Sequence, residues 1–249
     1  METRAIQVDK NAERRMEMKR RTIAFLLAAG IFCAGFVFFS GIGYTASEEA
    51  AAMMPERTAG GAAVFMPEDI RAGLIFYPGG LVDHRAYAPL MQALCDRGIL
   101  CLLAEMPLDL AVLDMNAADG LQALFPDVDM WIIGGHSLGG AMAASHVKKH
   151  AQAYDALLLL GAYSAEDLSG EGLCVLSVVG TEDGVLNREK YEACLAHYPA
   201  AFEEVILEGG CHAGFGDYGA QKGDGQPVMT RETQIQKTAD AVSALVDRL

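Results

Sequence analysis

The sequence has few basic residues and a strongly negative balance of charge. Lys and Arg number 19 against 33 Asp and Glu, so the net charge at pH 7 is −14. Seven of the basic and four of the acidic residues fall in residues 1–21, which leaves 12 basic against 29 acidic residues, a net −17, for the remainder. An acidic surface repels polyanions, and this argues against nucleic acid or anionic lipid headgroups as partners of that remainder.

Metal-binding cysteine patterns are also absent. The six cysteines include no CxxC pair and no Cys/His spacing typical of zinc sites. Five widely spaced cysteines follow residue 47, and an odd number at such spacing is not typical of a disulfide framework. An oxidising compartment would still allow one or two bridges among Cys95, Cys101, Cys174, Cys194 and Cys211. The chain shows no internal repeat and no insertion long enough for a lid domain. Neither a metal nor an organic cofactor is expected.

Charged residues are missing from one long stretch near the N-terminus. None occurs from Thr22 to Ser47, and the segment Ile23 to Phe39 is almost wholly apolar. Such a segment is long enough to cross a bilayer as a helix. Five basic residues lie shortly before it and two glutamates follow it, which by the positive-inside rule predicts a cytoplasmic segment 1–21 and a transmembrane anchor 22–44.

This orientation places the rest of the chain outside the cell membrane as a single-pass protein. A cleaved signal peptide is the alternative, favoured by the small residues after Tyr44 and disfavoured by the length of the apolar run. Residues 45–61 are small and polar, which predicts a flexible linker. Residues 62–249 form the predicted folded domain, a size typical of one α/β domain.

Within this domain, short apolar runs alternate with segments of helical periodicity. The expected strands are 62–66 (at the sheet edge), 72–77, 99–104, 130–133, 156–160, 174–179 and 203–207. The expected helices are 85–97, a looser stretch 108–124, 138–150, 187–197 and 230–249. This alternation predicts an α/β fold with a mostly parallel sheet and helices on both faces. Ligands of such sheets bind at the carboxyl ends of the strands.

The clearest functional motif is the run Gly135-His136-Ser137-Leu138-Gly139, between an apolar strand and a helix of small residues. Its pattern is typical of a nucleophile elbow, in which flanking glycines let strand and helix approach closely around an exposed serine. A serine hydroxyl becomes a useful nucleophile only with a base beside it and amide donors for the oxyanion. The motif predicts Ser137 as the nucleophile, with an ordinary glycine-rich turn as the alternative.

A base and an orienting acid should follow the elbow in chain order. His212 follows the last expected strand in a glycine-rich loop, so it is the predicted base. Asp183 lies at the end of the strand 174–179, directly before a glycine, and is the predicted acid. Its neighbour Glu182 and the later Asp217 remain alternatives.

Backbone amides should complete this site. The Leu138 amide, at the start of the helix, is one expected oxyanion donor, and Gly80 or Leu81 supplies the other. Of the remaining histidines, His136 is expected to be structural, and His146 and His150 are expected at the surface. His84 is expected in a solvated loop, with a pocket-lining position as the alternative, and His197 lies at the end of an expected helix.

Four segments together resemble known proteins: 76–83 (FYPGGLVD), 134–140 (GGHSLGG), 180–184 (GTEDG) and 209–219 (GGCHAGFGDYG). From about Arg71 onward the chain resembles the α/β-hydrolase superfamily, in particular small bacterial hydrolases near the dienelactone-hydrolase-like members. The resemblance implies an α/β-hydrolase fold without a lid domain and hydrolysis through an acyl-serine. Dienelactone hydrolase itself has cysteine at the position of Ser137.

These observations together predict a membrane-anchored, extracytoplasmic serine hydrolase. A carboxylesterase acting on small or medium esters is expected, with Ser137, Asp183 and His212 as its catalytic triad. The alternatives are an acyltransferase or peptidase with the same triad, and a non-catalytic protein of this fold that binds a ligand. The expected partner is a small-molecule ester or acyl substrate.

Overall fold

The computed structural model describes residues 43–249, and residues from Tyr44 onward form one compact unit. The predicted cytoplasmic segment 1–21 and all but the last two residues of the predicted anchor 22–44 lie outside the described residues. Within 43–249, no helix has both the length and the apolar character needed to cross a membrane.

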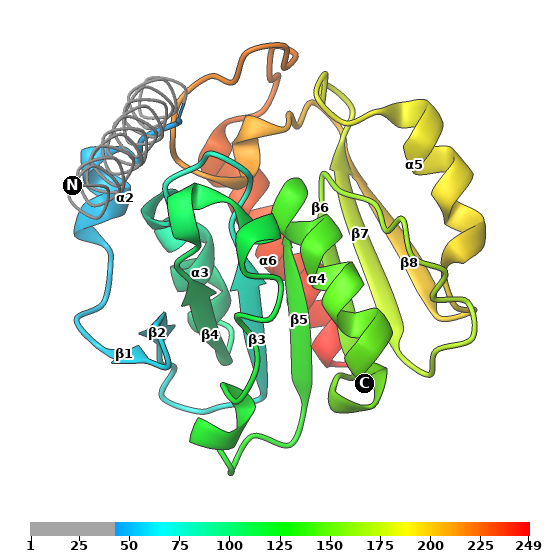
Figure 1. Cartoon of the computed structure of the whole chain (residues 1–249). Helices are drawn as coiled ribbons and strands as arrows, with labels where there is room; N and C mark the ends of the chain where they lie inside the picture. Colours follow the sequence, from blue (N-terminus) through cyan, green and yellow to red (C-terminus); the bar gives the residue numbers. More distant parts are fainter. Residues whose placement is uncertain (1–42) are drawn as a thin grey trace, which may run out of the picture. The chain divides into compact units, whose positions relative to one another are not determined.

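An eight-stranded sheet runs through the unit in the order β1-β2-β4-β3-β5-β6-β7-β8 (Figure 1). The six strands from β4 to β8 in this order are parallel, whereas β2 pairs antiparallel with both β4 and β1. The strands are β1 Thr58–Ala59, β2 Ala62–Phe65, β3 Ala72–Tyr77, β4 Ile99–Ala104, β5 Trp131–His136, β6 Ala156–Leu160, β7 Cys174–Gly180 and β8 Phe202–Leu207. The mostly parallel sheet is confirmed. The expected edge strand β2 is instead covered by β1.

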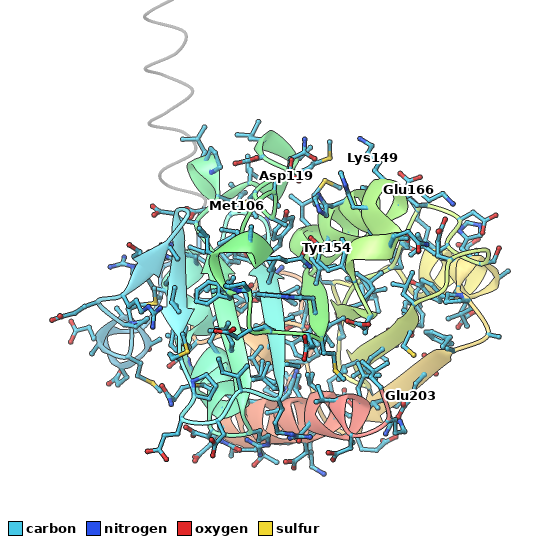
Figure 2. All side chains as sticks on the ribbon, turned by 90° about the horizontal axis from the view of Figure 1, so that it is seen from below. Met106, Asp119, Lys149, Tyr154, Glu166 and Glu203 are labelled. Carbon is cyan, nitrogen blue, oxygen red and sulfur yellow. The ribbon has the colours of Figure 1, made fainter. Side chains whose placement is uncertain are left out.

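Helices pack on both faces of this sheet, as the alternating pattern predicts. The α-helices are α2 Glu48–Ala52, α3 Ala88–Cys95, α4 Leu138–His150, α5 Arg188–Cys194 and α6 Arg231–Val246. Figure 2 shows α6 on the opposite side of the sheet from α4. Successive strand residues point to opposite faces. Leu74 and Phe76 therefore pack in the core under α3 and α6, while Ile75 and Tyr77 pack in the core under α4.

The stretch 108–124 is not the helix that its apolar residues suggest. It contains three short 3-10 turns, η2 Pro107–Asp109, η3 Ala111–Leu113 and η4 Gln122–Leu124. Val112, Leu113 and Leu124 are exposed, so the apolar residues form no single buried stripe. Asp, Asn and Gly are poor helix formers and interrupt the middle of the segment. The remaining 3-10 turns are η1 His84–Tyr87, η5 Ala151–Ala153, η6 Leu195–His197 and η7 Ala213–Phe215.

The segment expected to be a flexible linker, 45–61, packs against the domain. Tyr44 donates its N–H to the Leu81 carbonyl at 2.7 Å and accepts from the Asp83 amide at 2.9 Å. Ser47 caps α2 and donates its hydroxyl to Asp217 Oδ2 at 2.7 Å, while Ala50 is completely buried. Small side chains, which suggested flexibility, here permit close packing. The structure thus differs from the expected linker.

Candidate active site

Ser137 lies at the sharp turn between β5 and α4, with φ 52° and ψ −121°. A side-chain-bearing residue rarely adopts this backbone conformation, and its strain is typical of functional positions. Glycines make the turn sterically feasible, because a Cβ at Gly135 or Gly139 would collide with the Tyr77 carbonyl oxygen at the end of β3. The local geometry is therefore that of a nucleophile elbow rather than an ordinary turn.

Asp183 and His212 form a buried pair at the same edge of the sheet. Asp183 follows β7 and His212 follows β8, and His212 Nδ1 lies 2.8 Å from Asp183 Oδ2. The other carboxylate oxygen, Oδ1, accepts the amides of Val185 at 2.9 Å and Leu186 at 2.8 Å. With both oxygens hydrogen-bonded, the carboxylate is fixed in orientation and holds the imidazole in turn.

The two alternative acids have other partners. Glu182, although adjacent to Asp183, accepts a hydrogen bond from the Thr181 hydroxyl at 3.2 Å. Asp217 accepts from the Ser47 hydroxyl and also forms an ion pair with Arg231. Of the three candidate acids, the structure brings only Asp183 to His212.

Ser137 and His212 line one cavity of about 310 Å³. Its walls are largely apolar and include Leu138, Tyr163 and Leu186. The second ring nitrogen of His212, Nε2, is buried and forms no hydrogen bond with any residue in 43–249. With Nδ1 held by Asp183, Nε2 is the nitrogen left to take a proton from a hydroxyl in this cavity.

The structure distinguishes between Gly80 and Leu81, the two candidates for the second oxyanion donor. The Leu81 amide donates to the Asp109 carbonyl at 2.7 Å and is therefore occupied. Gly80 lies next to Leu138, since a Cβ at Gly80 would come within 2.9 Å of Leu138 Cδ2. Leu138 is the first residue of α4, where an N–H has no partner within its own helix. The remaining candidate donors are the amides of Leu138 and Gly80.

His136 is a structural residue, as expected, but its connection to the base was not foreseen. The Gly79 amide donates to Tyr87 Oη at 3.0 Å, and the same oxygen is hydrogen-bonded to His136 Nδ1 at 2.7 Å. The His136 ring also packs against His212, with 4.4 Å between centroids. Burial, with a smaller contribution from His212, lowers the pKa of His136 well below its usual value. A neutral, fixed ring thus links the loop after β3 to the predicted base.

Asp224 is the other residue that sequence analysis missed. Its Oδ1 accepts from the amides of His212 and Gly184, both at 3.1 Å, and its Oδ2 accepts from Ala213 at 2.8 Å. A single carboxylate thus joins the loop of the acid to the loop of the base. The only sequence signal was an aspartate between two glycines, Gly223 and Gly225, which is typical of a turn.

Known proteins share this architecture. The sequence profile described as "Alpha/beta hydrolase family" matches residues 73–236. The esterase domain of a Rhodothermus marinus protein is 16% identical with a TM-score of 0.55, covering 75% of this chain and 92% of that chain. Est1E from Butyrivibrio proteoclasticus is 13% identical with a TM-score of 0.56, covering 76% and 94%. A second structure of Est1E, with ferulic acid bound, is 14% identical with a TM-score of 0.54, covering 75% of this chain and 95% of that chain.

XC6422 from Xanthomonas campestris, described as an a/b serine hydrolase without lid, is 13% identical with a TM-score of 0.52, covering 74% of this chain and 88% of that one. None of the curated proteins compared matches the chain. Identities this low establish a shared fold only, whereas the family profile spans more than half of the sequence. By that match, and by a sheet and elbow of the corresponding form, this chain belongs to the alpha/beta hydrolase family.

Proposed function

We propose that the protein is a serine carboxylesterase that cleaves small or medium esters through an acyl-serine intermediate. The observation that carries this proposal is the shared cavity: Ser137, held at a strained turn, faces the same space as His212, whose other nitrogen is hydrogen-bonded to a buried carboxylate. A nucleophile, a base and an orienting acid in this arrangement suit acyl transfer.

In the proposed reaction, His212 Nε2 takes the hydroxyl proton as Ser137 Oγ attacks the ester carbonyl. The amides of Leu138 and Gly80 stabilise the negative charge on the tetrahedral intermediate. His212 then donates its proton to the departing alcohol, which leaves the acyl group on Ser137. Water, deprotonated by the same nitrogen, releases the acid and restores the serine. Asp183 orients the ring and stabilises its transient positive charge.

The dimensions and lining of the cavity support a modest, apolar acyl group. A volume of about 310 Å³ lies at the low end of small-molecule sites. Ala141, Ala162, Val185 and Leu186 on its walls offer no charge to bind an ionic substrate. Binding of ferulic acid by Est1E illustrates that a related fold accommodates an aromatic acid.

Hydrolysis of p-nitrophenyl acetate and butyrate by the full-length protein tests the proposal, together with labelling by a fluorophosphonate. Ser137→Ala and His212→Ala should each lower kcat/KM by roughly 10³-fold or more, and the serine variant should no longer be labelled. Ser169→Ala, at an exposed serine, is the matched control and should behave as wild type. A folded wild type that neither hydrolyses nor labels would contradict the proposal and favour a ligand-binding role.

We also propose that the apolar segment 23–39 anchors the protein in the cell membrane, with the hydrolase domain outside. The uncharged apolar segment and the basic residues before it support this. Tyr44, the last residue of the predicted anchor 22–44, packs against that domain instead. The protein should remain in membranes washed with alkaline carbonate, and its domain should be digested by protease added to intact spheroplasts. Release into the soluble fraction at the size of a cleaved chain would instead indicate a signal peptide.

A further inference from the structure

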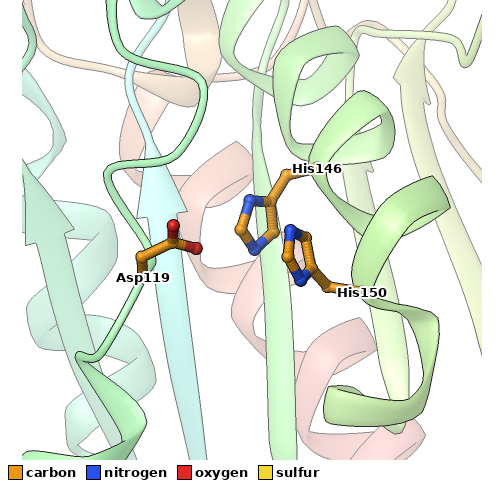
Figure 3. A group of neighbouring side chains, drawn as sticks. All are labelled: Asp119, His146 and His150. Carbon is orange, nitrogen blue, oxygen red and sulfur yellow. The ribbon is translucent and has the colours of Figure 1, made fainter.

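A compact group of metal-binding side chain types lies well away from the catalytic residues. His146 and His150 are one turn apart on α4, and Asp119 reaches them from the irregular segment between β4 and β5 (Figure 3). One donor atom from each of the three residues lies within 4.8 Å of the others. At 1.5 Å per residue, the two histidines lie about 12–18 Å along the helix from its start beside Ser137.

His146 is not the surface residue that the sequence suggested. It is only 3% exposed, and its Nε2 lies 3.0 Å from the Tyr154 hydroxyl. Its Nδ1 is buried without a hydrogen-bond partner among residues 43–249. The ring stacks on that of His150, with 4.4 Å between centroids and 21° between planes. A buried imidazole that leaves one nitrogen unpaired is costly unless another group satisfies it.

The spacing of the donors suits a shared ion. Zinc binds imidazole nitrogen at about 2.0–2.1 Å, so two ligands of one tetrahedral ion lie roughly 3.3 Å apart. Closing the observed separation needs a shift of about 1–1.5 Å at most. His150 and Asp119 are exposed, so small rotamer changes can supply that shift without repacking the core.

We propose that Asp119, His146 and His150 bind one first-row divalent transition metal ion, such as zinc, at a site separate from the catalytic cavity. Two imidazoles and one carboxylate favour zinc, copper, nickel or iron over magnesium or calcium, which prefer all-oxygen ligands. Water would fill the remaining coordination position. The ion would join the irregular segment around Asp119 to the C-terminal half of α4, and so would stabilise the folded chain.

The test is titration of the full-length protein with zinc chloride in an isothermal titration calorimeter, which gives the affinity and the stoichiometry. Thermal unfolding with and without zinc then gives the change in Tm. The protein is purified in mild detergent, without a polyhistidine tag and after treatment with a chelator. The variants are His150→Ala and Asp119→Asn, both at exposed positions outside the catalytic cavity. The matched controls are His197→Ala, in η6, and Asp129→Asn, an exposed aspartate just before β5.

Wild type and both controls should bind one zinc ion per chain, and saturating zinc should raise the Tm by on the order of 5 °C. Each site variant should bind at least about tenfold more weakly and show a correspondingly smaller rise, while its Tm without zinc stays near that of wild type. Wild type that binds no stoichiometric zinc would overturn the proposal. So would site variants that bind as tightly as the controls.

Discussion

Ser137, the proposed nucleophile, has an unfavourable backbone conformation. Its φ of 52° lies in the region that favours glycine, and a strained residue of this kind costs of order 1–3 kcal/mol. The fold tolerates the strain because the neighbouring glycines pack against the end of β3. The conformation that the proposed nucleophile needs therefore lowers the stability of the fold at this residue.

Two substitutions of this serine should distinguish the effect of backbone strain on stability from the effect of the hydroxyl on activity. Ser137→Gly relieves the backbone and should be more stable to unfolding than Ser137→Ala by about 1–2 kcal/mol, although both variants lack the hydroxyl and should be inactive. Urea unfolding of the two variants at pH 7 measures the difference. Equal stabilities would show that the turn carries no appreciable strain.

A second prediction concerns the pH dependence of stability, because burial holds the pKa of His136 well below its usual value. As the pH falls below about 6.5, an unfolded chain protonates this histidine while the folded chain keeps it neutral. The unfolded state then binds more protons, so the free energy of unfolding must decrease with falling pH, by up to about 1.4 kcal/mol per pH unit.

His136→Asn keeps an acceptor for the Tyr87 hydroxyl but cannot be protonated, so its stability should fall less steeply between pH 6.5 and 5 than that of wild type. Denaturant unfolding across this range gives both slopes. Parallel curves for wild type and variant would mean that His136 does not stay neutral in the folded protein.

Candidate residues can be named from the sequence where the pattern is local or ordered along the chain. Ser137 is a candidate from its flanking glycines, and His212 from its loop after the last strand, and the structure places both on one cavity. The contact between His136 and Tyr87 was not predicted, because the two residues lie 49 positions apart and no pattern in the intervening sequence indicates it. The Leu81 amide, expected as an alternative oxyanion donor, is satisfied by Asp109, a residue 28 positions away that no local signal indicates.

At the scale of elements, the candidate active site contains two loops that Asp224 joins. Burial raises the pKa of this carboxyl group, but four backbone hydrogen bonds, from Ala213, Gly184, His212 and Gly225, outweigh that effect and hold the pKa below its usual value. The charged carboxylate therefore fixes the acid loop relative to the base loop at neutral pH.

Asp224→Asn should lower kcat for ester hydrolysis by roughly 10–100-fold with little change in KM, because a small displacement of the base is costly. The amide retains one oxygen but presents a donor to one of the backbone N–H groups. Glu182→Gln, an acid in the neighbouring loop that pairs with Thr181, is the control and should retain activity. A fully active Asp224→Asn enzyme would show that the other contacts of these loops suffice.

The same variant has a defined pH signature. A lowered pKa means that the stabilisation by Asp224 is fully present above the ordinary aspartate pKa of about 3.9 and is lost as the pH falls through the lower folded value. The stability difference between wild type and Asp224→Asn should therefore be constant from pH 5 to 8 and shrink below pH 4.

Strands made of continuous apolar runs were predicted well, as was the helix after Ser137, whereas the irregular segment before β5 was not. The apolar runs of β3, β4 and β6 have the bounds expected from sequence, as does α4. The helix predicted for 108–124 is wrong because the apolar residues of this stretch do not share a face. Tertiary contacts rather than helical packing therefore set its turns. The order of the strands in the sheet was not predicted, because no single segment of the sequence specifies it.

At the scale of the whole molecule, the first described residues pack against the domain as part of it. Tyr44 contacts the loop after β3 through its backbone, and its ring packs on Tyr218 with 5.5 Å between centroids. Ser47 is hydrogen-bonded to Asp217. These contacts join the first residues of the unit to the loop after β3 and to the segment that follows η7. Composition alone could not reveal them, because small polar residues are equally typical of linkers.

A fragment that begins at Met54 should therefore be less stable than one that begins at Gly43. The lost hydrogen bonds and aromatic contact should cost about 2–4 kcal/mol, which corresponds to a Tm lower by on the order of 5–10 °C. Thermal unfolding of the two fragments by circular dichroism compares them directly. Coincident transitions would restore the interpretation of residues 45–61 as a linker.

The contacts of Asp224 with His212 and Ala213 also close a loop at its base. Residues 219–223, at the outer end of that loop, are mostly exposed, while the two ends are held by the same carboxylate. Lys222 and Gln221 also contact Tyr44 and Tyr218, whereas Gly219 and Ala220 are exposed. For engineering, we expect an epitope or a reporter peptide to be tolerated best at 219–220, and in related sequences changes of length should concentrate there.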